Sequence, residues 1–209
     1  LVGGDTTRGP LNLCLTALGE VPCGRALRRD GAQLGDDLWV SGQAGLAALG
    51  LAQLQARTKL PEALAKRCIS ALQRPLPRVE LGLALRERAL AHSAIDVSDG
   101  LLADLGHIAE RSSVDAEVFL PQLPCLPSGA EPGLVRHCQL AGGDDYELVF
   151  SASPDKRHEL AALAAELDLA LWRIGQIVAG QGEVRLLDEN GQTIPVSSKG
   201  FDHFGHQEK

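Results

Sequence analysis

Three short segments combine carboxylates with glycine beside an apolar stretch: residues 3–7 (GGDTT), 96–100 (DVSDG) and 142–148 (GGDDYEL). Carboxylates at strand ends can converge on a divalent cation, and Mg²⁺ prefers oxygen ligands, completing its shell with water and phosphate oxygens. Asp and Gly are also good turn formers, so each segment alone could be only a turn. The three together indicate a possible magnesium–phosphate enzyme.

Other patterns that could mark an active site are absent or ambiguous. The sequence contains no GxSxG and no HExxH. The predicted strand 38–41 is followed by Gly42 and a predicted helix, an order that suits an anion site at a helix start. The segment matches neither GxGxxG nor GxxxxGK[ST], and a tight strand-to-helix turn is the plainer explanation. His203 and His206 are expected to be tail residues.

Composition excludes several classes of protein. With 20 Lys and Arg against 27 Asp and Glu, the 209-residue chain carries a net charge of −7, so we expect no nucleic-acid or membrane partner. No apolar run approaches the roughly 18 residues that span a bilayer. The five cysteines include no CxxC pair, which argues against a disulfide framework and a zinc site. We expect a cytoplasmic protein whose cysteines fill core positions.

Hydrophobic periodicity predicts both helices and strands. The helices are expected over 42–56, 61–72, 79–91, 100–112 and 154–167. The strands are expected over 11–18, 38–41, 93–97, 115–120, 146–151 and 169–178, with a hairpin of 183–187 and 193–196. Residues 121–134 hold four prolines and are expected to form a loop. Because helices and strands do not alternate strictly, the predicted class is α+β, with a mostly antiparallel or mixed sheet covered by helices.

The quoted turns and their surroundings resemble one enzyme family. GGDTTRGPL, VPCGRALRRDGA, SAIDVSDGLLADLGHIAE, LAGGDDYELVF and KGFDHF, in this order from Gly3 to Phe204, are similar to the thiamine-monophosphate kinase family. The wider superfamily includes aminoimidazole ribonucleotide synthetase, HypE and selenophosphate synthetase. The resemblance implies an aminoimidazole ribonucleotide synthetase C-terminal-like fold, and ATP-dependent phosphorylation of thiamine monophosphate to thiamine diphosphate with Mg²⁺.

The resemblance also implies roles for individual residues. The matches to ATP contacts are Gly4, Asp5, Arg29 and Ser98. The matches to Mg²⁺ ligands are Asp5, Asp96 and Asp99. The matches to substrate contacts are Asp144, where many members have Glu, and Phe201, on which a substrate ring could stack. No protein nucleophile or strong general base is implied, because phosphoryl transfer depends mostly on positioning and charge neutralisation.

The chain departs from the family at its start. It contains no Met and opens inside a predicted strand, so we expect a fragment or a processed chain. Family members carry a domain ahead of GGDTT, with further metal ligands and the main dimer surface. We therefore expect residues 1–30 to be a remnant of that ATP-binding domain with its linker, and residues 31–209 to form the C-terminal α+β domain.

Three functions remain open at this point. The first is the kinase, a homodimer when complete, of which this chain alone would bind nucleotide weakly and turn over negligibly. The second is another ATP-dependent enzyme of the same superfamily, acting on a different phosphate-bearing or acyl substrate. The third is a non-catalytic binding or assembly module. Assays of substrate-dependent ATP consumption separate the first two, and Asn substitutions at Asp96 and Asp99 test the third.

Overall fold

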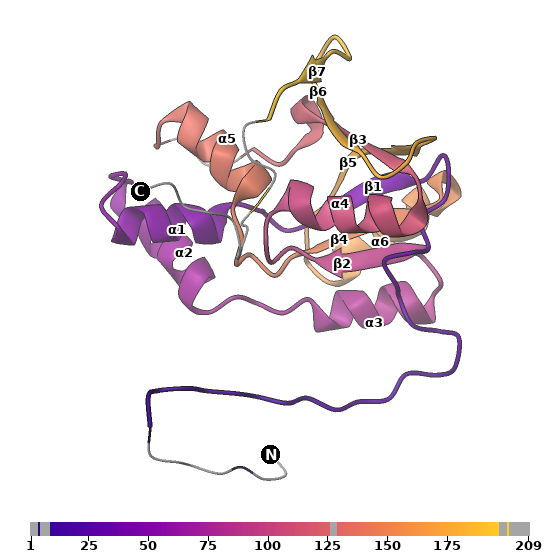
Figure 1. Ribbon diagram of the computed structural model, residues 1–209, viewed down its shortest axis with the longest axis horizontal. Helices are drawn as coiled ribbons and strands as arrows, with labels where there is room; N and C mark the ends of the chain where they lie inside the picture. The colour runs from indigo at the N-terminus through magenta and orange to yellow at the C-terminus, as the bar shows by residue number, and fades with distance from the viewer. Residues whose placement is uncertain (1–3, 5–8, 126–128, 197–199, 201–209) are drawn as a thin grey trace.

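A single mixed sheet forms the centre of the protein (Figure 1). The computed structural model describes residues 4, 9–125, 129–196 and 200. The strands are β1 (Asp37–Ser41), β2 (Ser93–Asp96), β3 (Asp115–Phe119), β4 (Leu148–Ala152), β5 (Leu171–Val178), β6 (Val184–Leu187) and β7 (Thr193–Ile194). Their order is β2-β4-β1-β5-β3-β6-β7, and neighbours are antiparallel except for the parallel pair β3 and β6. The predicted α+β class and mixed sheet are confirmed.

Helices cover both faces of the sheet and one side of it (Figure 1). The α-helices are α1 (Leu46–Leu54), α2 (Glu62–Gln73), α3 (Val79–Glu87), α4 (Leu101–Ser112), α5 (Pro132–Ala141) and α6 (Arg157–Glu166). Short 3₁₀ turns, η1 (Leu120–Gln122) and η2 (Pro154–Lys156), follow β3 and β4. α4 packs on one face, α3 and α6 pack on the other, and α1, α2 and α5 form a separate cluster beside the sheet.

Alternation along β1 explains why both faces need helices. Leu38 and Val40 belong to the core under α4, whereas Trp39 belongs to the core under α3 and α6. Trp39 stacks on Phe150 of β4, with ring centroids 6.4 Å apart. Because successive side chains of a strand point to opposite faces, an apolar run such as LWV is stable only when both faces are covered.

The predicted apolar stripe of α4 is confirmed. Leu101, Leu105 and Ile108 are all fully buried against the sheet. Their spacing of three and four residues places them on one side of a 3.6-residue helix. The helix ends at Ser113, whose positive φ of 54° marks the change to an extended backbone before β3. The helix is thus fixed along its length, which matters for the turn at its start.

The helix α5 is absent from the sequence prediction. Residues 121–134 were expected to be a loop because of their four prolines. Pro132 is instead the first residue of α5, a position where the missing N–H of proline costs nothing. The Glu131 side chain caps the helix by accepting hydrogen bonds from the backbone N–H groups of Gly133 and Leu134. A proline therefore marks the beginning of a helix here.

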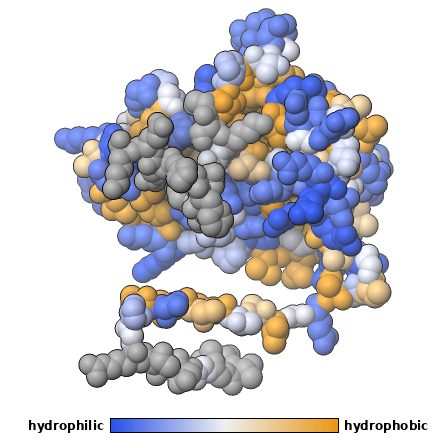
Figure 2. Space-filling model, in the orientation of Figure 1, coloured by the Kyte–Doolittle hydropathy of each residue, from blue (hydrophilic) through white to orange (hydrophobic). Residues whose placement is uncertain are grey.

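The predicted strand over residues 11–18 is wrong. The structure gives this segment no strand pairing and leaves Leu11, Leu13, Leu15 and Leu18 between 80% and 96% exposed. Figure 2 shows these apolar side chains along an extended segment that stands away from the rest of the molecule. The alternating pattern is real, but among the described residues no sheet or helix packs against it. Alternation alone therefore does not make a strand.

Several smaller predictions can also be checked. The hairpin of β6 and β7 is confirmed, with Gly191 at φ 75°. The register between β1 and β5 shifts between Leu38, which pairs with Gly175, and Trp39, which pairs with Arg173, so Ile174 forms a bulge. Ser153 precedes the 3₁₀ turn η2, but its side chain makes no capping hydrogen bond. The cysteine prediction is correct for two positions and wrong for three. The buried cysteines are Cys68 and Cys138, and the exposed ones are Cys14, Cys23 and Cys125.

Candidate functional site

Two of the three acidic segments lie side by side in the fold. The first, residues 96–100, is the β2–α4 turn; the second, residues 142–148, is the acidic loop between α5 and β4. β2 and β4 are paired antiparallel neighbours, so the segments at their ends meet at the same edge of the sheet. The third segment, residues 3–7, falls largely outside the described residues.

Backbone hydrogen bonds hold the turn and the loop together. The Val97 N–H donates to the Glu147 carbonyl at 2.7 Å, and the Tyr146 N–H donates to the Val97 carbonyl at 2.8 Å. The Asp144 N–H donates to the Ser98 carbonyl at 3.0 Å. Asp144 and Tyr146 both have positive φ angles, of 67° and 53°. Because residues other than glycine rarely adopt a positive φ, the backbone of the loop is held in a specific and uncommon conformation.

Close packing at this junction requires glycine. A Cβ at Gly143 would lie 2.2 Å from the Ser98 carbonyl oxygen, which is far inside van der Waals contact. Gly100 has φ 126°, and a Cβ there would lie 2.9 Å from the Ala141 carbonyl carbon. The glycines of DVSDG and GGDDYEL therefore allow two loops and the end of α5 to approach one another.

Within the acidic loop, Asp145 is a structural residue. Its carboxylate accepts hydrogen bonds from the backbone N–H groups of Gly45, at 2.5 Å, and Ala47, at 3.0 Å. These groups lie at the N-terminus of α1, where the first N–H groups have no partner within the helix. Burial raises the pKa of Asp145 to about 7, although the two N–H donors act in the opposite direction.

Glu147 is also buried and structural. It forms a two-pronged ion pair with Arg78, with N–O distances of 2.6 and 2.5 Å. The Ser41 hydroxyl donates to the same carboxylate at 2.5 Å. Asp145 thus connects the loop to the start of α1, and Glu147 connects it to the start of α3 and the end of β1. A buried charge of this kind requires such partners to be tolerated.

Asp144 differs from its neighbours because its side chain is exposed and lines a cavity of about 550 Å³. Ser98 and Asp99 of the β2–α4 turn line the same cavity. The predicted metal, ATP and substrate residues Asp99, Ser98 and Asp144 therefore come together. Gly200, which precedes the predicted substrate contact Phe201, also lines this cavity; Phe201 itself lies outside the described residues.

The rest of this larger cavity comes from the helical cluster. Leu51 of α1 with Leu134 and Cys138 of α5 supply apolar walls. Arg57 and His137 also line the cavity, and the sequence analysis did not identify them. His137 lies on α5, a helix that the sequence pattern does not predict, and Arg57 follows α1 in a segment with no recognisable motif. A cavity of this size, with mainly apolar walls and a few polar groups, suits a small organic ligand.

A second cavity, of about 450 Å³, is lined by residues 94–96 of β2, by residues 27–30 and by the last turn of α4. The predicted ATP contact Arg29 and the predicted metal ligand Asp96 both line it. The Ser112 hydroxyl, at the end of α4, donates to the Arg29 carbonyl at 3.0 Å and so fixes the backbone there. Arg111 also lines this cavity and was not identified from the sequence. The smaller cavity is therefore rich in cationic side chains.

Charge is unevenly distributed around this smaller cavity. Arg28 forms a two-pronged ion pair with Asp30, at 2.8 and 2.5 Å, and this contact lowers the pKa of the Asp30 carboxyl. Arg111 acts on the same carboxylate over a longer range. Guanidinium groups of this kind are suited to binding phosphate oxygens.

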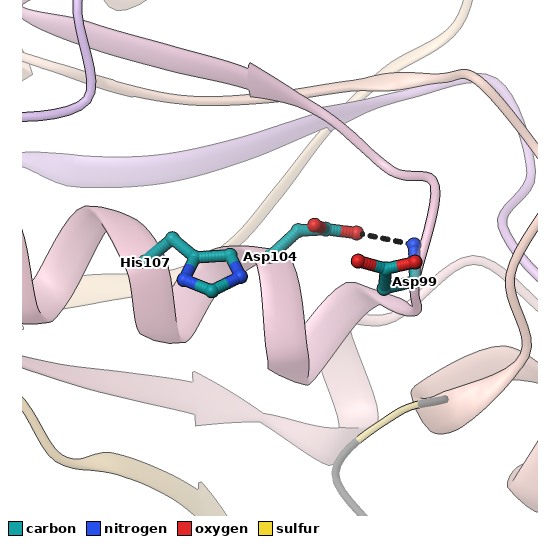
Figure 3. Close-up of side chains that lie close together, drawn as sticks. All are labelled: Asp99, Asp104 and His107. Atoms are coloured by element: carbon teal, nitrogen blue, oxygen red, sulfur yellow. Dashed lines mark hydrogen bonds between the residues drawn. The ribbon is translucent and has the colours of Figure 1, made fainter. Parts of the chain in front are cut away.

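Asp104 of α4 lies directly behind the β2–α4 turn (Figure 3). One of its carboxylate oxygens accepts hydrogen bonds from the N–H groups of Ser98, Asp99 and Gly100, at 2.9, 3.0 and 3.2 Å. Burial raises the pKa of Asp104, and the N–H donors partly offset this effect. Ligand atoms of Asp99, Asp104 and His107 lie within 4.8 Å of one another.

The remaining predicted residues stay untested. Asp5, a predicted ATP and metal contact, lies outside the described residues, as does Phe201. Gly4 is exposed and lines neither of the two cavities, so its predicted contact with ATP remains a prediction.

Known proteins share this fold and sequence. The family model described as AIR synthase related protein, C-terminal domain, matches residues 33–188. The curated thiamine-monophosphate kinase of Escherichia coli (strain K12) is 43% identical over 209 residues, covering 98% of this chain and 63% of that relative. The crystal structure of thiamine-monophosphate kinase from Stenotrophomonas maltophilia K279a is 49% identical with a TM-score of 0.73, covering 83% of this chain and 56% of that chain. The structure of AaThiL complexed with AMPPCP and TMP is 30% identical with a TM-score of 0.68, covering 85% and 54%.

The fold and the match to the family model together show which family the chain belongs to. The mixed sheet with its helical layers defines an α+β domain of the AIR synthase C-terminal type. The chain belongs to the family of AIR synthase related proteins, through their C-terminal domain. It spans 63% of the length of the curated thiamine-monophosphate kinases first matched. Among the described residues, no helix combines the length and apolar character needed to cross a membrane.

Proposed function

We propose that this chain carries the C-terminal part of a thiamine-monophosphate kinase, which transfers a phosphoryl group from ATP to thiamine monophosphate. One observation carries the proposal: carboxylates three residues apart in the chain line two different cavities, Asp96 the smaller and Asp99 the larger. In this reaction the donor and acceptor phosphates must lie close together, at a place where their negative charge is neutralised. The names of the relatives support the same activity.

The two cavities suit different ligands. The larger cavity has apolar walls for the rings of thiamine monophosphate, and Asp144 is placed to accept a hydrogen bond from the amino group of that substrate or to attract its cationic ring. The smaller cavity has Arg29 and Arg111 to attract the phosphates of ATP. Ser98 lies between them in sequence, which suits a hydroxyl that contacts the transferred phosphate.

Magnesium fits the donor set of the turn. Asp96 and Asp99 offer carboxylate oxygens, which are the ligands that Mg²⁺ prefers, and Asp5 would join them if the resemblance holds. When bound, Mg²⁺ neutralises charge on the phosphate oxygens. The chain's own residues orient the two ligands: Arg29 holds the nucleotide phosphates and Asp144 holds the acceptor. A phosphate monoester is largely ionised at neutral pH, so no strong general base is required.

The test is a pair of NMR titrations of the ¹⁵N-labelled chain in the presence of Mg²⁺. Thiamine monophosphate should shift amide signals around the larger cavity, and a non-hydrolysable ATP analogue should shift those around the smaller one. Asp144→Asn should weaken only the first titration and Arg29→Met only the second, whereas Glu189→Gln, on the exposed hairpin, should change neither.

Opposite results would overturn the proposal. If thiamine monophosphate left the larger cavity unshifted at millimolar concentration while another phosphate-bearing superfamily substrate shifted it, the assignment to this kinase would be wrong. The proposal also includes a homodimer for the complete enzyme and a cytoplasmic location, with no nucleic-acid or membrane partner. Sedimentation of a full-length relative would check the first of these.

A further inference from the structure

Asp104 is a buried carboxylate whose role the activity alone does not explain. Its side chain is 1% exposed, and no lysine or arginine among the described residues pairs with it. Burying a carboxylate without a cation is costly unless hydrogen bonds replace its water. Its presence in the first turn of α4 therefore indicates a specific function for its oxygens.

Those oxygens act on the backbone of the β2–α4 turn. The same oxygen, Oδ2, accepts from three successive N–H groups, those of Ser98, Asp99 and Gly100. Figure 3 shows the second of these bonds, from the Asp99 N–H. Three N–H groups that converge on one atom fix the path of the chain between them, as in anion-binding backbone nests. The turn is thus held by α4 on one side and, through the bond from the Asp144 N–H to the Ser98 carbonyl, by the acidic loop on the other.

We propose that Asp104 is a positioning residue that sets the Asp99 carboxylate and the Ser98 hydroxyl at the larger cavity, without itself binding metal. The inference rests on the proposed function, because it assigns a purpose to the geometry of Asp99. The Asp104 carboxylate occupies the position that a bound anion would otherwise fill, and so orders the three N–H groups of the turn. The turn is consequently rigid before any ligand binds, which is what a metal and phosphate site requires.

The competing role is that of a third metal ligand. Asp99, Asp104 and His107 have ligand atoms within 4.8 Å of one another, close enough to share an ion. Two observations oppose this role: Asp104 is fully occupied at Oδ2, and His107 offers nitrogen, whereas Mg²⁺ prefers oxygen. The two roles make different demands, since positioning needs an oxygen in the right place and metal binding needs the charge.

Two substitutions of Asp104 distinguish the position of its oxygen from its negative charge. Asp104→Asn keeps an oxygen at the same distance from the backbone but loses the charge, and Asp104→Glu keeps the charge but displaces the oxygen by one methylene. In the 209-residue chain, hydrogen exchange of the Ser98, Asp99 and Gly100 amides reports positioning. Broadening of NMR signals by Mn²⁺ reports metal binding at the turn. Glu110→Gln, an exposed carboxylate on the same helix, is the control.

We expect Asp104→Asn and Glu110→Gln to keep slow exchange of the three amides and nearly unchanged Mn²⁺ affinity. Asp104→Glu should speed their exchange and weaken Mn²⁺ binding about tenfold, the usual effect of removing a residue that orients a ligand. If Asp104→Glu fails to fold, as thermal melting would reveal, Asp104→Asn alone still decides the question.

Results that contradict the positioning role of Asp104 differ from results that contradict the metal role of Asp99. If Asp104→Asn weakened Mn²⁺ binding as much as Asp99→Asn, Asp104 would be a ligand and the inference would be overturned. If Asp99→Asn abolished binding while Asp104→Glu behaved like the unchanged chain, only the inference would fail. If Mn²⁺ did not broaden the turn in the unchanged chain, the metal role of Asp99 and the inference would both fail.

Discussion

At the scale of single residues, neighbouring carboxylates have opposite roles. In GGDDYEL, Asp144 is exposed at a cavity, whereas Asp145 and Glu147 are buried and hold α1 and Arg78. In the β2–α4 turn and the helix after it, Asp96 and Asp99 line cavities while Asp104 supports the turn from behind. An acidic cluster in a sequence can therefore contain both cavity-lining and structural members, and only the fold separates them.

The pKa of Asp145 predicts a specific pH dependence of stability. Its folded pKa of about 7 lies above the ordinary value of 3.8, so between these values the folded state binds more protons than the unfolded state. Stability contributed by this group therefore falls as pH rises through that window. The asparagine of Asp145→Asn cannot ionise. From about pH 5 to about pH 8, the free energy of unfolding of the unchanged chain should therefore fall by about 3 kcal/mol relative to that of the variant.

Urea denaturation of both proteins across this pH range checks the prediction. Other titrating groups are shared by the two proteins, so the difference in unfolding free energy isolates Asp145. Glu189→Gln, on the exposed hairpin, should track the unchanged chain at every pH. A difference between Asp145→Asn and the unchanged chain that stayed constant with pH would show that the buried carboxyl titrates normally.

At the scale of elements, the sequence alone predicts a helix or hairpin correctly where its hydrophobic periodicity is strong and a turn residue marks its end. The stripe of α4 and the Asn-Gly hairpin are local features, and both are confirmed. The failures have identifiable causes. The prolines of 121–134 predict a loop, yet Pro132 begins α5, and the alternation of 11–18 predicts a strand, yet no described strand pairs with it. Pairing partners and packing faces are long-range properties that no local window contains.

The packing of α1 on α2 gives a prediction about helical glycines. A Cβ at Gly50 of α1 would lie 2.3 Å from the Cys68 carbonyl oxygen of α2, so Gly50→Ala must push the helices apart. We expect a loss of about 2 kcal/mol, because overpacking outweighs the gain of about 1 kcal/mol in helix propensity. At Gly106 of α4 the nearest atom is Val184 Cγ2 at 3.9 Å, so Gly106→Ala should stabilise by about 0.5–1 kcal/mol.

Thermal melting of the two variants tests this contrast directly. Each kcal/mol should move the midpoint by about 2–4 °C for a chain of this size. Equal effects at the two positions, in either direction, would mean that the close approach of α1 and α2 does not require glycine. The comparison is internally controlled, because both substitutions add the same methyl group within an α-helix.

At the scale of the whole molecule, the site forms where two parts of the fold meet. The sheet with α4 supplies the β2–α4 turn, and the helical cluster supplies the apolar walls of the larger cavity. Resemblance to a family predicted roles for Asp96, Asp99, Ser98, Asp144 and Arg29, and all five line one of the two cavities. Cavity residues such as Arg111, Arg57 and His137 could not be found that way, because they reach their cavities only through tertiary packing.

The extended N-terminal segment gives the last prediction. Residues 9–24 stand away from the folded body with exposed leucines (Figures 1 and 2). The next residue, Arg25, is tied to that body by its guanidinium, which donates to the Glu87 carbonyl at 3.3 Å. Brief proteolysis should therefore cut within 9–24 first. Removal of residues 1–24 should leave the melting midpoint unchanged, because residues 9–24, which the structure describes, are exposed and bury little apolar surface.

A longer deletion provides the matched control. Removing residues 1–30 also removes the Arg28 carbonyl, which accepts from the Ala94 N–H at 3.0 Å and so covers the outer edge of β2. It also removes Arg29 from the smaller cavity. We expect this variant to melt lower, by the equivalent of about 1–3 kcal/mol for an edge left without its hydrogen-bond partner, and to lose the response to the ATP analogue. If the shorter deletion destabilised the protein as much as the longer one, residues 9–24 would have to pack on the folded body in solution, and the leucines at 11, 13 and 15 would then form the strand that their alternation predicts.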